Sequence, residues 1–155
     1  MIPVLLQSFL VEETKRLFDG FTLKNIKGEE SPLKVYPQHL PAKKNQNDTE
    51  HYPHIIVRLL DGEDPQEMYP NQCRVHFYFG VVDKTSDYQG YLDSLNMVQK
   101  LYDHLMRKRL FDKKYTVEYP VKWSVTEEDY YPYYYAGLET VWTIGKVTME
   151  DDEFV

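Results

Sequence analysis

The chain has 155 residues, of which 42% are hydrophobic, and it carries one cysteine and a formal net charge of −7. This length fits one domain, residues 1–155, better than two, and the apolar content is enough for a core, which excludes global disorder. A single cysteine excludes an intramolecular disulfide framework and favours a reducing compartment.

The negative charge is concentrated at the C-terminal end. Residues 126–155 hold eight acids and one base, whereas acids and bases balance over the remainder. A surface that binds nucleic acids without sequence preference needs the opposite bias. We interpret residues 148–155 as an acidic tail, and we expect residues 150–153 to be exposed and dispensable for folding because buried acids need matching bases.

The first predicted element is a helix over residues 3–18. Pro3 suits a first helical turn, and Gly20 suits the position after a helix. One face of the helix carries Leu6, Phe9, Leu10, Glu13 and Leu17. The apolar start of the chain is short, without a preceding basic residue or a small-residue cleavage site. We therefore expect neither a signal peptide nor a membrane span.

Residues 21–27 are predicted to form a strand, and residues 28–53 a long loop. The loop contains four prolines and a polar run, residues 43–50, without a sustained period. Long loops inside a domain are often functional or ordered only on binding, so we expect residues 43–50 to be mobile in the isolated protein. Val35 and Tyr36 are compatible with a short strand within this loop.

Four later segments read as strands: residues 55–60, 73–82, 117–125 and 133–147. Alternation in the second places Val75, Phe77, Phe79 and Val81 on one face. In the third, one face holds Val117, Tyr119, Val121, Trp123 and Val125, which predicts a buried Trp123. Pro120 predicts an edge strand or a bulge there. In the fourth, Leu138, Trp142 and Ile144 share a side.

A helix is predicted over residues 88–111. Ser86 and Gln89 fit a capping box, and the basic residues 107–109 complement the negative end of the helix dipole. Its apolar stripe, which suits packing on a sheet, consists of Tyr91, Leu95, Val98, Tyr102 and Leu105, and the last four are expected in the core. Because strands outnumber helices and do not alternate with them, the predicted class is α+β. We expect a mainly antiparallel sheet with two main helices packed on one face.

The sequence contains no phosphate-binding glycine loop, nucleophile elbow or zinc-finger spacing, so we predict no catalytic residue, metal ligand or cofactor, and no enzyme. His51 and His54 lie beside Pro53 rather than on a helix face, and no third metal ligand is near. Cys73 begins an apolar strand, which predicts a buried, inert thiol. Asp103 and His104 are adjacent on the predicted helix and point to different faces.

The candidate partner interface is the tyrosine segment Tyr130, Tyr131, Tyr133, Tyr134 and Tyr135. Alternation sends successive strand side chains to opposite faces, so at least two of the five should be exposed or covered by a partner. Tyrosine is enriched at protein interfaces, where it combines apolar area with a hydroxyl group. The alternative is that the long loop of the same chain covers the segment.

Residues 55–144 resemble the tail terminator, or tail completion, proteins of phages and prophages of Gram-positive bacteria. The similar segments are HIIVRLLDGED, VHFYFGVVDKTSDYQGYLDSLNMVQKLYDHL and YPVKWSVTEEDYYPYYYAGLETVWTI. In the third, Lys122–Trp123 is followed by an acidic turn, a Tyr-Pro-Tyr and the run Gly137 to Thr140 leading to Trp142.

The resemblance implies an α+β fold, no catalytic residues, and a ring, typically of six copies, that caps the finished tail tube. Such a ring ends tube polymerisation and forms the surface to which the head docks. Its partners would be copies of itself, the tail tube protein and a head-completion or connector protein, with DNA only passing through and no membrane. The location would be the head-proximal end of the virion tail, after assembly in the host bacterial cytoplasm.

The alternative is a small cytoplasmic ligand-binding domain or enzyme with a pocket between sheet and helices. Such a pocket needs convergent polar groups, and His39, His76 and His104 are the suggestive ones.

Overall fold

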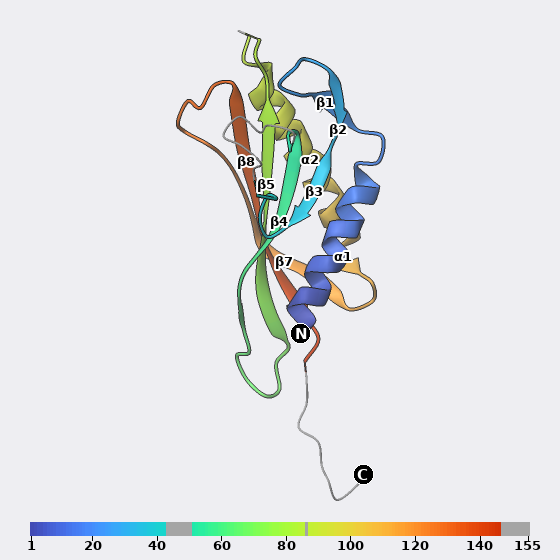
Figure 1. The fold of residues 1–155 in the computed structure, drawn as a ribbon. Helices are drawn as coiled ribbons and strands as arrows, with labels where there is room; N and C mark the ends of the chain where they lie inside the picture. The colour runs from blue at the N-terminus through green and yellow to red at the C-terminus, as the bar shows by residue number, and fades with distance from the viewer. Residues whose placement is uncertain (43–50, 86, 147–155) are drawn as a thin grey trace, which may run out of the picture.

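The computed structural model describes residues 1–42, 51–85 and 87–146, and it confirms the α+β class (Figure 1). Helices α1 (Ile2–Leu17) and α2 (Gln89–Lys108) pack on one face of a six-stranded sheet. The predicted mobile run, residues 43–50, and the predicted acidic tail, residues 148–155, lie outside the described residues.

The main sheet has the strand order β3–β4–β5–β8–β7–β6. Its strands are β3 (Lys34–Pro37), β4 (His54–Glu63), β5 (Asn71–Val82), β6 (Leu110–Phe111), β7 (Tyr115–Val125) and β8 (Tyr133–Ile144). All neighbours are antiparallel except β3 and β4, which are parallel. Helix α2 connects β5 to the far edge of the sheet, so β8 returns between β7 and β5.

The alternation read from the sequence identifies the face that the helices cover. Every second residue of β5 is buried, and the same holds for much of β8. The predicted members Val75, Phe77, Phe79, Val81, Leu138, Trp142 and Ile144 are all at most 3% exposed. They join Leu6 and Leu10 of α1 and Met97 and Leu101 of α2 in one core cluster. The two amphipathic helices therefore close over the apolar face of the sheet.

The predicted loop over residues 28–53 is wrong for its first part. β1 (Thr22–Lys24) pairs with β2 (Glu30–Pro32) in a separate two-stranded hairpin, so the strand predicted at residues 21–27 is shorter and lies outside the main sheet. The turn is organised by Asn25, whose Oδ1 accepts hydrogen bonds from the backbone N–H groups of Lys27 and Glu29 at 2.9 and 3.1 Å. Gly28 supplies the positive φ of 80°.

The short strand expected around Val35 and Tyr36 is confirmed as β3. It lies at the edge of the sheet and pairs with β4 on one side. A proline is tolerated there because an edge strand needs only one row of hydrogen bonds. The predicted loop is therefore too long, because its prolines are evidence against strands in general. An edge strand with a single partner can contain a proline such as Pro37.

Helix α2 is shorter than predicted and is rotated about its axis. It ends at Lys108 because Arg109 takes a φ of 61°, after which Leu110–Phe111 form β6. Tyr88 is the N-cap residue, and the predicted capping box depends on Ser86, which lies outside the described residues. The buried side chains are Gly90, Ser94, Met97, Val98, Leu101 and Leu105.

The predicted stripe of α2 is therefore right at Val98 and Leu105, partly right at Tyr102, which packs against the core, and wrong at Tyr91 and Leu95. Tyr91 is 47% exposed, and Leu95 and Tyr102 are half-buried. These three side chains lie on the flank of the helix, where Tyr102 alone of the three packs against the core cluster. Sequence periodicity placed the apolar arc, whereas the docking angle of the helix decided which part of the arc is covered.

The expectation that Trp123 is a core residue is wrong. Trp123 pairs with Leu138, which is fully buried, so both side chains project to the helix side of the sheet. Trp123 is nevertheless 63% exposed. Helix α2 lies to one side of Trp123 and leaves a groove beside it, and β6 pairs only with the first residues of β7. Alternation determines the face of a strand residue, but burial needs an element lying over it.

The prediction of an edge strand or a bulge at Pro120 is confirmed. The register of β7 against β8 shifts between Glu118 and Lys122, so residues 119–121 lie opposite Thr140 alone. Beyond this bulge β7 is the edge of the sheet in the described structure. Tyr119 lies in the bulge with 68% of its surface exposed, and the guanidinium carbon of Arg109 lies 4.7 Å from the centroid of its ring.

Candidate partner-binding site

The five tyrosines of the candidate interface are divided between three environments. Tyr130 and Tyr131 precede β8 and are each 48% exposed. Tyr134 projects to the helix side, whereas Tyr133 and Tyr135 project to the opposite face of the sheet. The expectation that at least two would be exposed is confirmed; their role as an interface remains a prediction.

The other three tyrosines are covered by the chain itself. Tyr52 lies in the predicted loop region and packs on Tyr133 with 5.0 Å between ring centroids, and its hydroxyl is 2.7 Å from that of Tyr135. Tyr134 lies over Gly90, where an added Cβ would come within 2.3 Å of the ring. The alternative interpretation, cover by the long loop, is therefore right for Tyr133 and Tyr135.

Five exposed large apolar side chains on β7 and on the turn between β7 and β8 are here together called the β7 strip. It consists of Tyr119, Trp123, Val125, Tyr130 and Tyr131, which are between 40% and 68% exposed. Large apolar side chains that lie together in solvent mark interaction surfaces more often than chance placements do. Sequence reasoning placed Trp123 in the core and therefore missed the β7 part of this surface, although it named Tyr130 and Tyr131. The available signal was Pro120, which already indicated an edge.

Beside the strip, a groove of about 470 Å³ opens between α2 and the sheet. Its lining is Leu95, Val98, Gln99, Tyr102, Val121, Trp123 and Leu138. The half-buried flank of α2 forms one wall and Trp123 the other. The groove is mostly apolar, so it fits an apolar side chain or a small apolar ligand rather than an ion.

A second cluster joins His51 and His54 to tyrosines on the sheet face away from the helices. The hydroxyl of Tyr36 is 3.0 Å from His51 Nδ1, and His54 Nδ1 donates to the carbonyl oxygen of His51 at 3.1 Å. Burial lowers the pKa of His54 to about 4, which keeps the ring neutral. Burial also raises the pKa of Tyr52, together with its hydrogen bond to Tyr135. These packed rings hold residues 51–54 against the sheet.

The three histidines suggested for a ligand pocket do not converge. His39 is 3.3 Å from Arg58, His76 is 3.2 Å from the Tyr78 hydroxyl, and His104 contacts Glu13. His76 lies on the face of β5 away from the helices, whereas His104 belongs to α2. Cys73 is 2% exposed, which confirms a buried thiol, and burial raises the pKa of that thiol to about 11, as expected of an inert cysteine.

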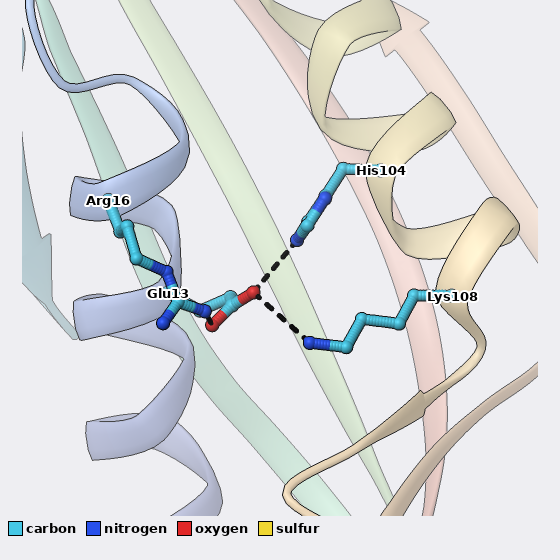
Figure 2. A network of polar contacts seen from close by, with 4 residues as sticks. All are labelled: Glu13, Arg16, His104 and Lys108. Atoms are coloured by element: carbon cyan, nitrogen blue, oxygen red, sulfur yellow. Dashed lines mark hydrogen bonds and ion pairs between the residues drawn. The ribbon is translucent and has the colours of Figure 1, made fainter.

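Glu13, the one charged member of the predicted α1 stripe, is the centre of an interhelical ion cluster (Figure 2). Its side chain is 5% exposed. Oε1 lies 2.9 Å from His104 Nε2 and 3.8 Å from Lys108 Nζ, both on α2, while Oε2 pairs with Arg16. The carboxylate is thus compensated in the interior by neighbours that reach solvent. The contacts tie α1 to α2 and involve none of the lining residues of the groove.

We predict that Glu13→Gln lowers the free energy of unfolding by about 1–2 kcal/mol, because charge-assisted hydrogen bonds at a buried position become neutral ones. Urea denaturation measures the change. Glu12→Gln is the matched control, since the Glu12–Lys15 pair is exposed on the same helix and should contribute less than about 0.5 kcal/mol. Equal losses in the two variants would contradict a structural role for the buried cluster.

Among the described residues, no group of three or more His, Cys, Asp or Glu side chains is arranged to hold a metal ion. Neither of the helices in that part of the chain has the length and apolar content needed to cross a membrane. Comparison with models of known protein families and with curated proteins finds no match to this sequence.

Proposed function

We propose that the protein caps a phage or phage-derived tail tube as a ring of several copies, ending polymerisation of the tube and forming the surface to which the head docks. The sequence resemblance supports this proposal. The observation that carries it is the β7 strip, where Trp123 and Tyr119 are each more than 60% exposed along a strand edge. A surface of this kind is typical of a protein that assembles with others.

A small α+β domain suits this role for a physical reason. A polymer of stacked rings grows until a component matches its end yet presents a different outer face. A domain whose copies contact one another head to tail forms a closed ring when the rotation between copies closes. Two sides of each copy are then used for neighbours, and a further side, which we assign to the β7 strip, contacts the tube protein.

We predict that the purified chain, added to the tube protein of its own particle, shortens the tubes and occupies their ends in electron micrographs. The double variant Tyr130→Ser, Tyr131→Ser should fold normally and lose this effect, since both side chains are exposed. Tyr134 is unsuitable for the test because it packs on Gly90 beneath α2.

The matched control is Leu5→Ser, which removes an exposed apolar side chain, 59% exposed, from α1. It should cap tubes as well as the unaltered chain. Tubes that reach normal length and join heads in particles lacking the protein would overturn the proposal.

A second candidate function is binding of a small apolar ligand in the groove between α2 and β7. Its volume of about 470 Å³ falls in the range of small-molecule pockets. Trp123 lines the groove, so its fluorescence should change on binding. A response of Trp123 to a small molecule, in a chain that leaves tubes unchanged, would favour this candidate over the ring.

A further inference from the structure

The tip of the β4–β5 hairpin, residues 61–69, is an exposed acidic patch, here called the acidic hairpin. It contains four acids and no base, and every residue in it is exposed. Asp61 is paired with Arg74 at 2.7 Å, and Asp64 with Lys146 at 2.6 Å. Glu63 and Glu67 remain without an ion pair to any described residue.

The end of α2 and the β6–β7 turn, residues 107–114, form the opposite patch, here called the basic turn. It contains five bases and one acid. Three of the bases have acidic neighbours: Lys108 with Glu13 at 3.8 Å, Arg109 with Glu118 at 4.0 Å and Lys114 with Asp112 at 3.6 Å. Arg107 and Lys113 are exposed and form no ion pair within the described ranges.

Each patch also exposes apolar side chains that suit an interface. Met68 and Tyr69 of the acidic hairpin are 89% and 56% exposed, and Leu110 of the basic turn is 51% exposed. Interfaces that are stable combine such apolar contacts with complementary charges around them. The two patches thus carry opposite charges, and both expose apolar side chains.

The positions of the patches prevent contact within one copy. They belong to opposite sides of the strand order, since the hairpin joins β4 to β5 and the turn joins β6 to β7. In Figure 1 the green hairpin tip extends at the lower left, beyond the helices, and the orange turn lies to the right beside α1. Opposite charges on separate sides of one rigid domain can meet only between two molecules.

We propose that the acidic hairpin of one copy binds the basic turn of the next copy of this chain. Because the two patches differ, the contact is head to tail, and repetition produces a ring if the rotation closes. The inference rests on the proposed function for closure into a ring, whereas the contact itself is argued from the two patches. It leaves the β7 strip free for the tube protein.

The contact has a predictable dependence on salt. Exposed charges are strongly screened at about 1 M salt, where the screening length falls to about 3 Å. Self-association at low ionic strength should therefore weaken as NaCl is added. Reversing one patch places like charges opposite each other and should raise the dissociation constant by roughly a hundredfold.

Charge exchange tests the pairing directly. The hairpin variant carries Glu63→Lys and Glu67→Lys, and the turn variant carries Arg107→Glu and Lys113→Glu. Sedimentation velocity at low salt should show the unaltered chain as an oligomer and each variant alone as a monomer. An equimolar mixture of the two variants should associate again, because each reversed patch then meets a complementary one. The control Glu29→Lys, Glu30→Lys changes the charge equally on the β1–β2 hairpin and should leave association unchanged.

Two results would overturn the inference. One is an unaltered chain that remains monomeric at low salt at the highest concentration it tolerates, and the other is a mixture that does not associate.

A full-length chain with residues 150–153 changed to amides should associate no more strongly than the unaltered chain. Stronger association would show that the chain's own acids occupy the basic turn. Tubes left uncapped by a chain that passes the exchange test would contradict the proposed function alone.

Discussion

Replacing Trp142 with alanine should lower the free energy of unfolding by about 3–5 kcal/mol, the loss expected when a large aromatic side chain is removed from a core. Trp142 is fully buried near the C-terminal end of β8. Its ring packs edge-to-face on Phe111 at 5.7 Å, and its Nε1 donates to Thr140 Oγ1 at 2.8 Å. The substitution leaves a cavity and removes the donor to that buried hydroxyl, so both packing and hydrogen bonding are lost.

Trp123→Ala is the matched control, since it removes the chain's other tryptophan from a neighbouring strand. Trp123 is 63% exposed, so the loss should be less than about 1 kcal/mol. Urea denaturation followed by far-ultraviolet circular dichroism measures both variants on the same scale. Similar losses would show that Trp123 is covered in solution. A folded Trp123→Ala variant also tests the β7 strip, because it should fail to cap tubes.

Acidification should destabilise the protein through His54. Burial holds the pKa of His54 near 4 in the folded chain, against 6.5 in the unfolded chain. Below pH 6.5 the unfolded chain binds a proton that the folded chain does not. The free energy of unfolding therefore decreases as the pH is lowered from 6.5 to about 4. The stability present above 6.5 and lost by about 4 amounts to about 3 kcal/mol.

His54→Asn isolates this contribution. An asparagine amide can donate to the His51 carbonyl in place of Nδ1, but it does not titrate in this range. Burial lowers the pKa of His76 as well, so the difference between the two proteins, rather than the slope of either, reports His54. The control is His39→Asn at an exposed position. If the unaltered chain and His54→Asn show parallel curves of unfolding free energy against pH, the burial of a neutral His54 is wrong.

Local patterns in the sequence determined the class of fold and the faces of its main elements. Alternation identified the buried residues of β5 and β8, such as Phe77 and Leu138, because strand geometry fixes successive side chains on opposite faces. The expectation that some tyrosines of the candidate interface remain uncovered is met by Tyr130 and Tyr131, but these precede β8, where alternation does not apply. Pro120 located the bulge in β7, since a proline interrupts the hydrogen bonding of a sheet.

The candidate site depended on which element lies over which face. Trp123 has the orientation predicted from alternation, yet α2 does not cover it, and it lines a groove instead of the core. Glu13 was an anomaly in a helical stripe until α2 brought His104 to it from 91 positions away. Tyr52 belongs to a segment predicted as loop, but it covers Tyr133 on another strand.

For the acidic hairpin and the basic turn too, the sequence determines one part and the tertiary structure another. Their charges can be counted in the sequence, but only the strand order places them on opposite sides of one domain. Local periodicity depends on backbone geometry over a few residues, so the sequence by itself was enough for elements and faces. Cover, exposure and long-range pairing depend on how helices dock and where strands end. Those were decided by packing between segments far apart in the chain, and only the tertiary structure contains that information.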